Sequence, residues 1–394
     1  MMNTAQTNSE PGEAFPATGD RILSLDALRG LIMILMALDH ASFLIARVHP
    51  GEFWGVPLPV YRESLAFVTR FVSHFCAPGF FFLMGTGMVL FAASRRHYQW
   101  TDRRIMRHFL LRGLILIIMQ FVIENAAWLL GSLSGPVPVV TIPGGGDMLL
   151  LHFGVLYGLG ASMIVWALAL RFNTGIVLTI SAIAILATQV FTPSPENASL
   201  LYPPLLRALL IPGRTGILQA YYPLIPWLGF CGLGVTFGRA LRNDRSRTFR
   251  VATIAAMASL VLFGVLRLAN GFGNFHPVQR GWIGFLNVTK YPPSLTFTFL
   301  TLGLNLLLLS LFEKNRQQLQ RWGKPLMTYG KTALFFYIVH IYLYALIGFI
   351  FPGRTSFTVM YPIWLLGLIL LYPLCRWYGN FKRRTAPDSV WRFF

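Results

Sequence analysis

The most constraining feature of this sequence is a series of apolar segments, each close to the length of a membrane span and separated by short polar stretches. An α-helix of about 20 apolar residues crosses the hydrocarbon core of a bilayer, because each residue adds about 1.5 Å. Over the whole chain 55% of the residues are hydrophobic and 12% are charged, whereas soluble domains average about 25% charged residues. The sequence therefore predicts an all-α, polytopic integral membrane bundle of about 10–11 transmembrane helices.

The apolar segments also define the organisation of the chain. The predicted spans are roughly 26–47, 71–93, 109–131, 148–170, 174–192, 220–238, 251–268, 294–312, 326–350 and 358–378. The stretch 201–219 is apolar but interrupted by Pro and Gly, so we interpret it as a re-entrant or interfacial segment or as part of an eleventh span. We divide the chain into a disordered cytoplasmic tail (1–21), a transmembrane domain (22–380) and a basic cytoplasmic tail (381–394).

The positive charges are distributed unevenly between the two sets of loops. If the N-terminus is inside, the segments on that side contain most of the 33 lysine and arginine residues. Because cytoplasmic loops are enriched in Lys and Arg, both termini are predicted to be cytoplasmic. The same bias explains the net charge of +19, so we expect no nucleic-acid partner. The three cysteines lie in apolar segments without metal-ligand spacing, and no metal is expected.

Several predicted spans contain ionisable side chains, which are costly inside a bilayer and are candidates for function. Five of them lie at a similar depth, roughly 21–24 Å from the predicted cytoplasmic side. They are His40, His74, Glu124, His152 and His340, and Asp39 and Asn125 share their layer. A single histidine in a membrane helix most often only hydrogen-bonds to a neighbouring helix. Five groups at one depth predict a shared polar cavity toward the outer face.

The segment RGLIMILMALDH, residues 29–40, connects this layer with the cytoplasmic side. Arg29 and His40 are three helical turns apart, so they share one face, about 16.5 Å apart along the axis. Arg29 could hold an anion such as a phosphate, or it could extend to the membrane interface. His40 could act as a general base or as a transient nucleophile. Asp39 points about 100° away and is expected to serve a neighbouring helix rather than His40.

Five stretches of the chain resemble a known family. They are SLDALRGLIMILMALDH (24–40), TRFVSHFCAPGFFFLMGTG (69–87), YPLIPWLGFCGLG (222–234), KYPPSLTFTFLTLG (290–303) and GKTALFFYIVHIYLYAL (330–346). Together they resemble bacterial membrane proteins of the heparan-α-glucosaminide N-acetyltransferase-like type, within the superfamily of transmembrane acyltransferases. The likeness extends from about residue 22 to residue 380 and so covers nearly the whole chain.

The resemblance implies a reaction. Acetyl-CoA or another acyl-CoA would bind from the cytoplasmic side, and the acyl group would pass to an acceptor on the outer side, which is a sugar, a glycan or another small molecule. Related surface-polysaccharide O-acyltransferases have an Arg or Lys, ten residues and then a His in the first span, which Arg29 and His40 match. The family's cytoplasmic arginines correspond to Arg104 and Arg107. In the animal lysosomal enzyme the reactive histidine lies in an outer loop. The nearest equivalent is His49, which we interpret as an ordinary loop histidine.

These observations give one leading hypothesis, an acyl-CoA-dependent acyltransferase of the bacterial inner membrane, in contact with lipid. The resemblance also makes a homodimer plausible. The candidate residues are catalytic His40, Asp39, His74, Glu124, His152 and His340, CoA-binding Arg29, Arg104 and Arg107, and acceptor-binding Lys290 and Tyr291. One alternative is a proton-coupled transporter of a small polar solute that uses the same His and Glu layer. Another is a membrane protein with a structural or assembly role.

Overall fold

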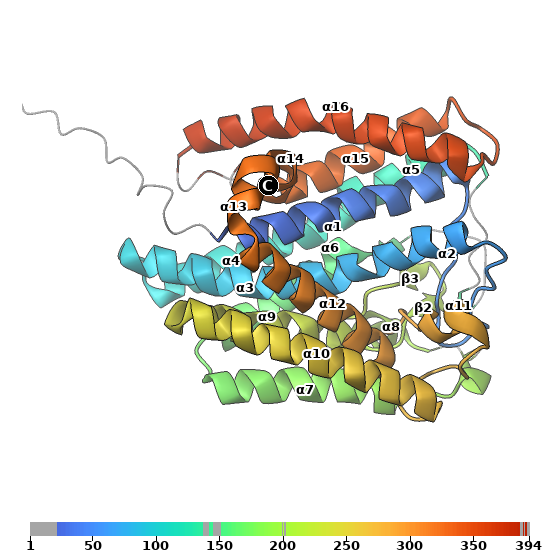
Figure 1. The fold of residues 1–394 in the computed structure, drawn as a ribbon, viewed down its shortest axis with the longest axis horizontal. Helices are drawn as coiled ribbons and strands as arrows, with labels where there is room; N and C mark the ends of the chain where they lie inside the picture. The colour runs from blue at the N-terminus through green and yellow to red at the C-terminus, as the bar shows by residue number, and fades with distance from the viewer. Residues whose placement is uncertain are drawn as a thin grey trace, which may run out of the picture.

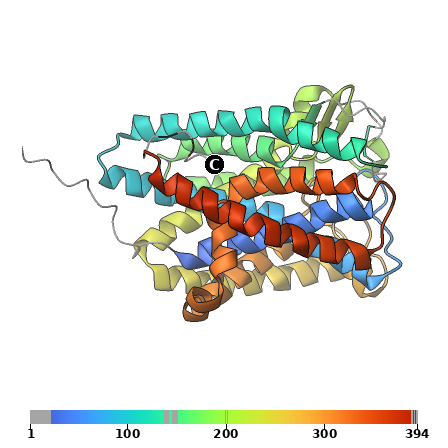
Figure 2. The same ribbon diagram turned by 90° about the horizontal axis from the view of Figure 1, so that it is seen from above.

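Long helices run side by side through the computed structural model, and the other elements gather at their ends (Figures 1 and 2). The structure describes residues 22–136, 142–144, 151–198, 200, 202–386, 389 and 391. The predicted tail 1–21 lies outside the described residues. We call the end of the bundle that carries the small β-sheet the strand end, on the right in Figure 1. The opposite end carries the connection between α3 and α4 and is called the arginine end.

The helices of the first half follow the apolar segments closely. They are α1 (Leu23–Ala41) with η2 (Ser42–Ala46), α2 (Ser64–Phe71), η3 (Val72–Phe75), α3 (Cys76–His97), α4 (Asp102–Met119), η4 (Gln120–Glu124), α5 (Asn125–Leu133), α6 (Val155–Ala169) and α7 (Thr174–Phe191). Some of these elements join into continuous helical runs, such as Ser64–His97 and Asp102–Leu133.

The second half adds shorter elements between its long helices. Its helices are η5 (Pro195–Asn197), α8 (Pro204–Leu209), α9 (Leu224–Asn243), α10 (Arg245–Ala269), α11 (Gly281–Leu286), α12 (Leu295–Lys314), α13 (Arg316–Trp322), α14 (Lys324–Lys331), α15 (Ala333–Gly348) and α16 (Phe357–Arg384). The strands are β1 (Leu151–Phe153), β2 (Gly213–Thr215) and β3 (Leu218–Ala220), in the sheet order β1-β3-β2.

The described residues contain eight helices that are long and apolar enough to cross a membrane. A ninth span results if α14 and α15 count as one, although the chain bends by 94° between them. The apolar helix α6 is shorter than these. Every predicted span therefore coincides with an apolar helix or with this bent pair, and the prediction of an all-α integral membrane bundle is confirmed.

Two predicted segments have a different structure. The fourth span was expected to start at residue 148, but α6 begins only at Val155, and His152 lies in strand β1 before it. Of the predicted stretch 201–219, the described residues 202–219 do not form an eleventh span, because they contain the short helix α8 and the β2–β3 hairpin. Gly213 and Gly216 have positive φ angles of 136° and 56°, which turn the chain where a helix would have to continue.

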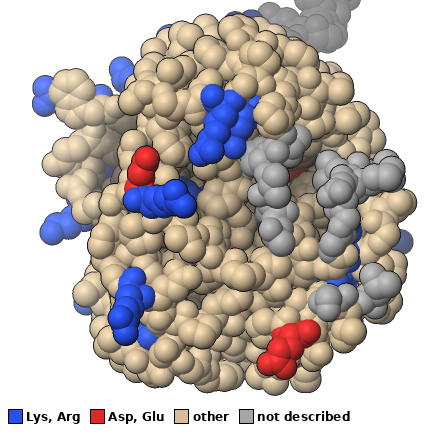
Figure 3. Space-filling view, turned by 90° about the vertical axis from the view of Figure 1, so that its right-hand side faces the viewer, with Lys and Arg blue, Asp and Glu red and all other residues tan. Residues whose placement is uncertain are grey.

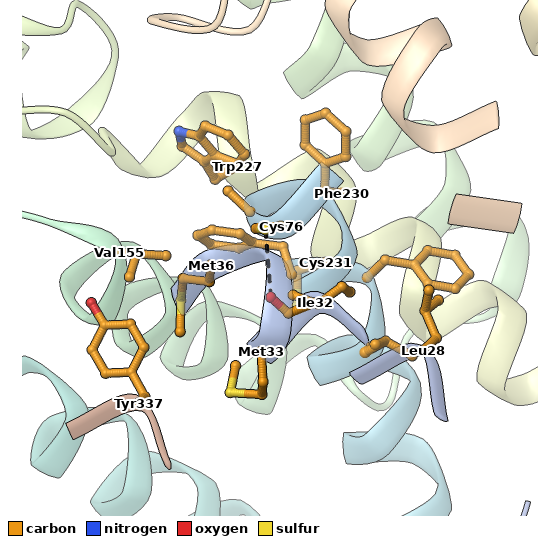
Figure 4. Close-up of a cluster of buried hydrophobic side chains, with 14 of the residues drawn as sticks. Leu28, Ile32, Met33, Met36, Cys76, Val155, Trp227, Phe230, Cys231 and Tyr337 are labelled. Carbon is orange, nitrogen blue, oxygen red and sulfur yellow. Dashed lines mark hydrogen bonds between the residues drawn. The ribbon is translucent and has the colours of Figure 1, made fainter. Parts of the chain in front are cut away.

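The first helix occupies the centre of the bundle, and close helix contacts fix its position. A β-carbon on Gly30 would overlap the carbonyl of Leu326 in α14, so only glycine allows α1 and α14 to approach this closely. On the other side, the Cys76 thiol lies 3.5 Å from the carbonyl oxygen of Ile32. Figure 4 shows this contact among the buried side chains that α1 shares with α3 and α9. These contacts hold α1 between the two halves of the chain.

The strand end closes the bundle with polar loops and the small sheet. β1 pairs with β3 in parallel and β2 pairs with β3 in antiparallel fashion, so that His152 and Arg214 both lie opposite Gln219. Seen from this end, charged side chains are scattered among other residues rather than gathered in one patch (Figure 3). The charges that matter for the site lie beneath this surface.

Candidate active site

Two histidines from opposite ends of the sequence meet inside the bundle. Nδ1 of His40 in α1 lies 2.7 Å from Nε2 of His340 in α15, and the rings stack with their centroids 4.9 Å apart. The exposed fractions of the two residues are 8% and 0%. Nδ1 of His340 lies 2.9 Å from the carbonyl oxygen of Phe336, one helical turn earlier. The sequence prediction placed both histidines at one depth, and the structure brings them into contact.

This chain of hydrogen bonds assigns the tautomers. A carbonyl oxygen can only accept, so Nδ1 of His340 carries the hydrogen, and Nε2 of the neutral ring is left as an acceptor. His40 must then donate from its own Nδ1, which leaves Nε2 of His40 with a lone pair. A backbone carbonyl thereby sets the protonation pattern of His40 through His340.

A small cavity lies beside His40. Its volume is about 50 Å³, which is room for only a few water molecules. Its lining residues come from α1, η3, α3, α6, α15 and two loops, and they are Met36, Asp39, His40, Ser73, Cys76, Ala77, Phe80, Val155, Tyr222, Lys290 and Tyr337. Carboxylate, imidazole, ammonium and phenol groups thus converge on one small space, and a few convergent polar groups in a pocket are typical of a binding site.

Asp39 turns away from His40 and contacts the helical run that begins with α2, as the sequence analysis predicted. Its Oδ1 accepts a hydrogen bond of 2.8 Å from Nη1 of Arg70 and one of 2.9 Å from the Ser73 hydroxyl. Arg70 is 3% exposed. The Asp39 carboxylate is therefore paired inside the protein, which lets a buried negative charge persist next to the cavity.

Glu52 completes this ion cluster from the loop after α1. Its two carboxylate oxygens accept bonds of 2.9 and 2.7 Å from Arg70, and Nε2 of His74 lies 3.6 Å from Oε2. Burial would raise the pKa of the Glu52 carboxyl, but Arg70 and His74 hold it well below its usual range. The backbone carbonyl of Glu52 accepts bonds from the backbone N–H groups of Lys290 and Tyr291, both 3.0 Å. The ion cluster thus anchors the loop that brings Lys290 to the cavity.

Glu124 reaches His40 through a tryptophan. Its Oε1 accepts a bond of 3.1 Å from Nε1 of Trp128, and the Trp128 ring lies edge-on to His40 at 5.1 Å. The second oxygen, Oε2, is buried and has no hydrogen-bond partner in the part of the chain that the structure describes. Glu124 belongs to the wall behind the histidine pair and is absent from the lining of the cavity.

His152 lies farther from the cavity than the sequence analysis predicted. Its ring contacts Tyr221 at 4.9 Å, and Tyr221 contacts Tyr291 at 5.1 Å. Burial lowers the pKa of His152 to about 4, so it is neutral at pH 7. The five predicted groups therefore do not form one cluster, because only His40 and His340 touch and His152 is separated from the cavity by tyrosines.

The predicted CoA-binding arginines lie at or toward the arginine end. Arg29 pairs with Asp26 at 3.2 Å and donates to the carbonyl of Gly330 at 3.3 Å. Arg112 lies close enough to Arg29 for their charges to interact, and its Nε is buried without a partner among the described residues. Arg104 stacks on Trp100 at 4.1 Å. Two like charges in the same neighbourhood, one with an unpaired buried Nε, are suited to hold an anion.

Three residues of the site were missed or misinterpreted in the sequence. His49 is not an ordinary loop histidine, since its Nδ1 lies 3.8 Å from Asp39 and its Nε2 lies 3.4 Å from Arg70. Burial and the nearby Arg70 lower the pKa of His49 to about 4. Neither Arg70 nor Glu52 was singled out in the sequence analysis. The available signal was an acid, Glu52, and a base, Arg70, both between the first and second predicted spans.

The comparison with protein families gives one result. Residues 21–269 match the family described as heparan-alpha-glucosaminide N-acetyltransferase, catalytic. A search of curated proteins returns no match. Within the described residues, no group of three His, Cys, Asp or Glu side chains is arranged to hold a metal ion. The matched region covers more than half of the chain and includes α1, the ion cluster and most of the cavity wall. The chain therefore belongs to the family of membrane acetyltransferases defined by the heparan-α-glucosaminide N-acetyltransferase catalytic domain.

Proposed function

We propose that this protein transfers an acyl group, acetyl in the first instance, from acyl-CoA to a hydroxyl or amino group of a sugar or glycan. Family membership supports the acetyl group. The density of Lys and Arg in the loops of the arginine end supports a cytoplasmic location for that end, with both termini inside. The donor would then bind from the cytoplasm, and the acceptor would reach the cavity from the strand end. The bacterial inner membrane is the proposed location.

The observation that carries this proposal is the fixed tautomer of His40 beside the cavity. The lone pair on Nε2 can remove the proton from an acceptor hydroxyl or amine. The acceptor atom then bonds to the thioester carbonyl carbon, the C–S bond breaks, and CoA leaves as a thiolate that takes up a proton. The same lone pair could instead attack the thioester and carry the acyl group on Nε2 before the acceptor takes it. The geometry supports both routes.

The remaining groups of the cavity have separate proposed roles. Lys290 presents a positive charge where a tetrahedral intermediate would develop an oxyanion, and such preorganised charge lowers the barrier. The Tyr222 and Tyr291 hydroxyls lie 3.4 Å apart and offer contacts for an acceptor. Asp39, held by Arg70, is proposed to balance the charge that builds up on His40. His340 holds the imidazole in its reactive tautomer.

The donor is proposed to lie along α1. Arg29 and Arg112 would bind CoA phosphates, with the exposed Arg104 and Arg107 as outer contacts. Between Arg29 and His40, α1 carries two buried methionines, Met33 and Met36, among other apolar side chains (Figure 4). Methionine is flexible and adapts to irregular shapes. It is therefore a suitable lining for a path that the thioester arm must open.

Binding and turnover together test the proposal. Purified protein should bind CoA and hydrolyse acetyl-CoA slowly, and His40→Ala should retain CoA binding but lose turnover. The exposed histidine His97 provides the control, since His97→Ala should change neither. CoA binding no stronger than background would exclude the acyltransferase and favour the proton-coupled transporter. Mass spectrometry of envelope glycans from a deletion strain would then identify the acceptor.

A further inference from the structure

A second cavity lies far from the histidine pair, between α10 and α12 at the arginine end. Its volume is about 560 Å³, within the range typical of ligand sites. Its lining residues come from the first turns of α10, the last turns of α12 and the start of α13, and they are Arg245, Ser246, Phe249, Arg250, Thr253, Leu307, Ser310, Leu311, Glu313, Lys314 and Arg316. We call this cavity the α10–α12 groove. Nothing in the proposed transfer reaction uses it.

The charges of the groove are not balanced. Glu313 is the one acidic residue that lines it, and Arg245 already holds both of its carboxylate oxygens at 2.9 and 3.0 Å. Arg250, Lys314 and Arg316 therefore leave an excess of positive charge. The N-terminus of α10, a helix of 25 residues, adds the positive end of its dipole. The rim of the groove is suited to an anion.

The floor of the groove is apolar, with one open polar atom. Phe249, Leu307 and Leu311 form the apolar wall. The hydroxyl of Ser310 is buried and has no hydrogen-bond partner among the described residues. The lining face of α10 continues past Thr253 to Met257 at the helical spacing of four. Met257 is 53% exposed, so the groove opens onto an apolar helix surface that faces the membrane.

We propose that the α10–α12 groove binds an anionic phospholipid from the leaflet at the arginine end. The phosphate would lie among Arg250, Lys314 and Arg316 and accept a hydrogen bond from Ser310. The acyl chains would follow the wall past Phe249 and along the exposed face of α10. Basic pockets between transmembrane helices on the cytoplasmic side recognise such head groups. A water-soluble phosphate would leave the apolar floor without a partner, which is why the membrane lipid is the favoured occupant.

The test uses the full-length protein, purified in detergent and depleted of lipid. Phosphatidylglycerol and phosphatidylcholine are added separately, and the lipid retained on the protein is quantified by mass spectrometry. We expect retention of phosphatidylglycerol alone. The double variant Arg250→Ala/Arg316→Ala should weaken its binding about 25-fold, on the order of 5-fold for each cation that contacts the head group. Arg242→Ala/Arg247→Ala removes two exposed cations outside the groove and should leave retention unchanged.

The test includes a variant that keeps the charges and two soluble competitors. If the alanine variant does not fold, Arg250→Lys/Arg316→Lys keeps the charges, and retention should fall less than 5-fold. Inorganic phosphate and CoA are added as competitors. Displacement of the lipid by either at millimolar concentration would overturn the proposal in favour of a soluble phosphate ligand. Equal retention of phosphatidylcholine, or equal losses in the groove variant and the control variant, would also overturn it. The proposed acyl transfer is tested separately, by the turnover of His40→Ala.

Discussion

Nδ1 of His40 and Nε2 of His340 lie 2.7 Å apart, although 300 residues separate them in the sequence. The contact makes His340 the residue that decides which nitrogen of His40 is free. A base in the wrong tautomer cannot accept a proton from the substrate even when its position is unchanged. The catalytic power proposed for α1 therefore depends on a residue in α15.

We expect His340→Phe to reduce acetyl-CoA turnover by a factor of about 10²–10⁴, the usual contribution of general acid–base catalysis. The ring shape is kept, but the acceptor for Nδ1–H of His40 is lost. The KM for acetyl-CoA should change little, because the proposed site for the donor's phosphates lies elsewhere, around Arg29 and Arg112. Steady-state kinetics measures both values, with His97→Phe as the control. A wild-type kcat in His340→Phe would show that the tautomer is irrelevant.

Removing the centre of the ion cluster should destabilise the fold. Arg70→Met leaves the carboxylates of Asp39 and Glu52 buried without their partner, which typically costs about 3–5 kcal/mol. The exposed pair of Arg96 and Asp102 is the matched control, because such pairs contribute only about 0–1 kcal/mol. Thermal unfolding in detergent, followed by tryptophan fluorescence, should show a large loss for Arg70→Met and almost none for Arg96→Met. Similar losses in both would contradict the assignment of a central role to Arg70.

Stability should decrease as the pH falls from about 6.5 to about 4. Burial, together with Arg70, lowers the pKa of His49 to about 4 from 6.5. Between these values the imidazole is protonated in the unfolded chain but neutral in the folded one, so acid favours unfolding. His49→Gln should remove part of this loss, on the order of 1–3 kcal/mol. Unfolding midpoints measured at pH 4.5 and pH 7 test this, and an unchanged pH dependence in His49→Gln would refute it.

Donor binding should depend on the half-buried arginines, Arg29 and Arg112, more than on the exposed ones. Arg112→Gln removes a cation near Arg29, and we expect CoA affinity to fall about 10-fold, as for loss of one charge-assisted contact. Arg104→Gln, at an exposed position, should lower it less than 3-fold. Isothermal titration with CoA gives both values. A larger loss of CoA affinity in Arg104→Gln than in Arg112→Gln would instead indicate that the phosphates bind at the exposed loop.

The crossing of α1 and α14 should tolerate no side chain. A β-carbon on Gly30 would overlap the Leu326 carbonyl, whereas one on Gly87 would meet no atom within 4 Å. Overpacking of this kind costs about 1–3 kcal/mol or more. We expect Gly30→Ala to lower the unfolding temperature and Gly87→Ala to leave it unchanged. Equal midpoints for the two variants would mean that the helices can separate without cost.

The fold was largely predictable because hydrophobic length alone identifies membrane helices. The exceptions are instructive. Residues 148–154 are as apolar as their neighbours, yet His152 lies in a strand, because its pairing with β3 depends on residues near 219 that sequence reading cannot connect to it. Similarly, the 94° bend between α14 and α15 has no proline at its centre. Tertiary contacts, not local propensity, determine the backbone conformation at these two places.

The site was predictable only in part, since depth in a membrane is one coordinate out of three. Counting turns placed His40 and His340 in the same layer, and they touch. The same count placed His152 there too, although tyrosines separate it from the cavity. Arg70 was overlooked because a basic residue near the end of a span ordinarily reflects topology. Its two acidic partners come from α1 and from a loop, and no periodic pattern in the sequence relates them.

The bent pair of α14 and α15 contacts both Arg29 and His40, the two polar residues that lie on one face of α1. Arg29 donates to the carbonyl of Gly330 in α14, and His40 donates to His340 in α15. An anion that draws Arg29 away from Gly330 acts on the same segment that sets the proton acceptor of His40. Binding linkage is reciprocal. Protonation of His40 is therefore expected to change the affinity for the donor by the same factor by which the bound donor changes the proton affinity of His40. Thr332, between α14 and α15, is where this coupling would pass from one helix to the other.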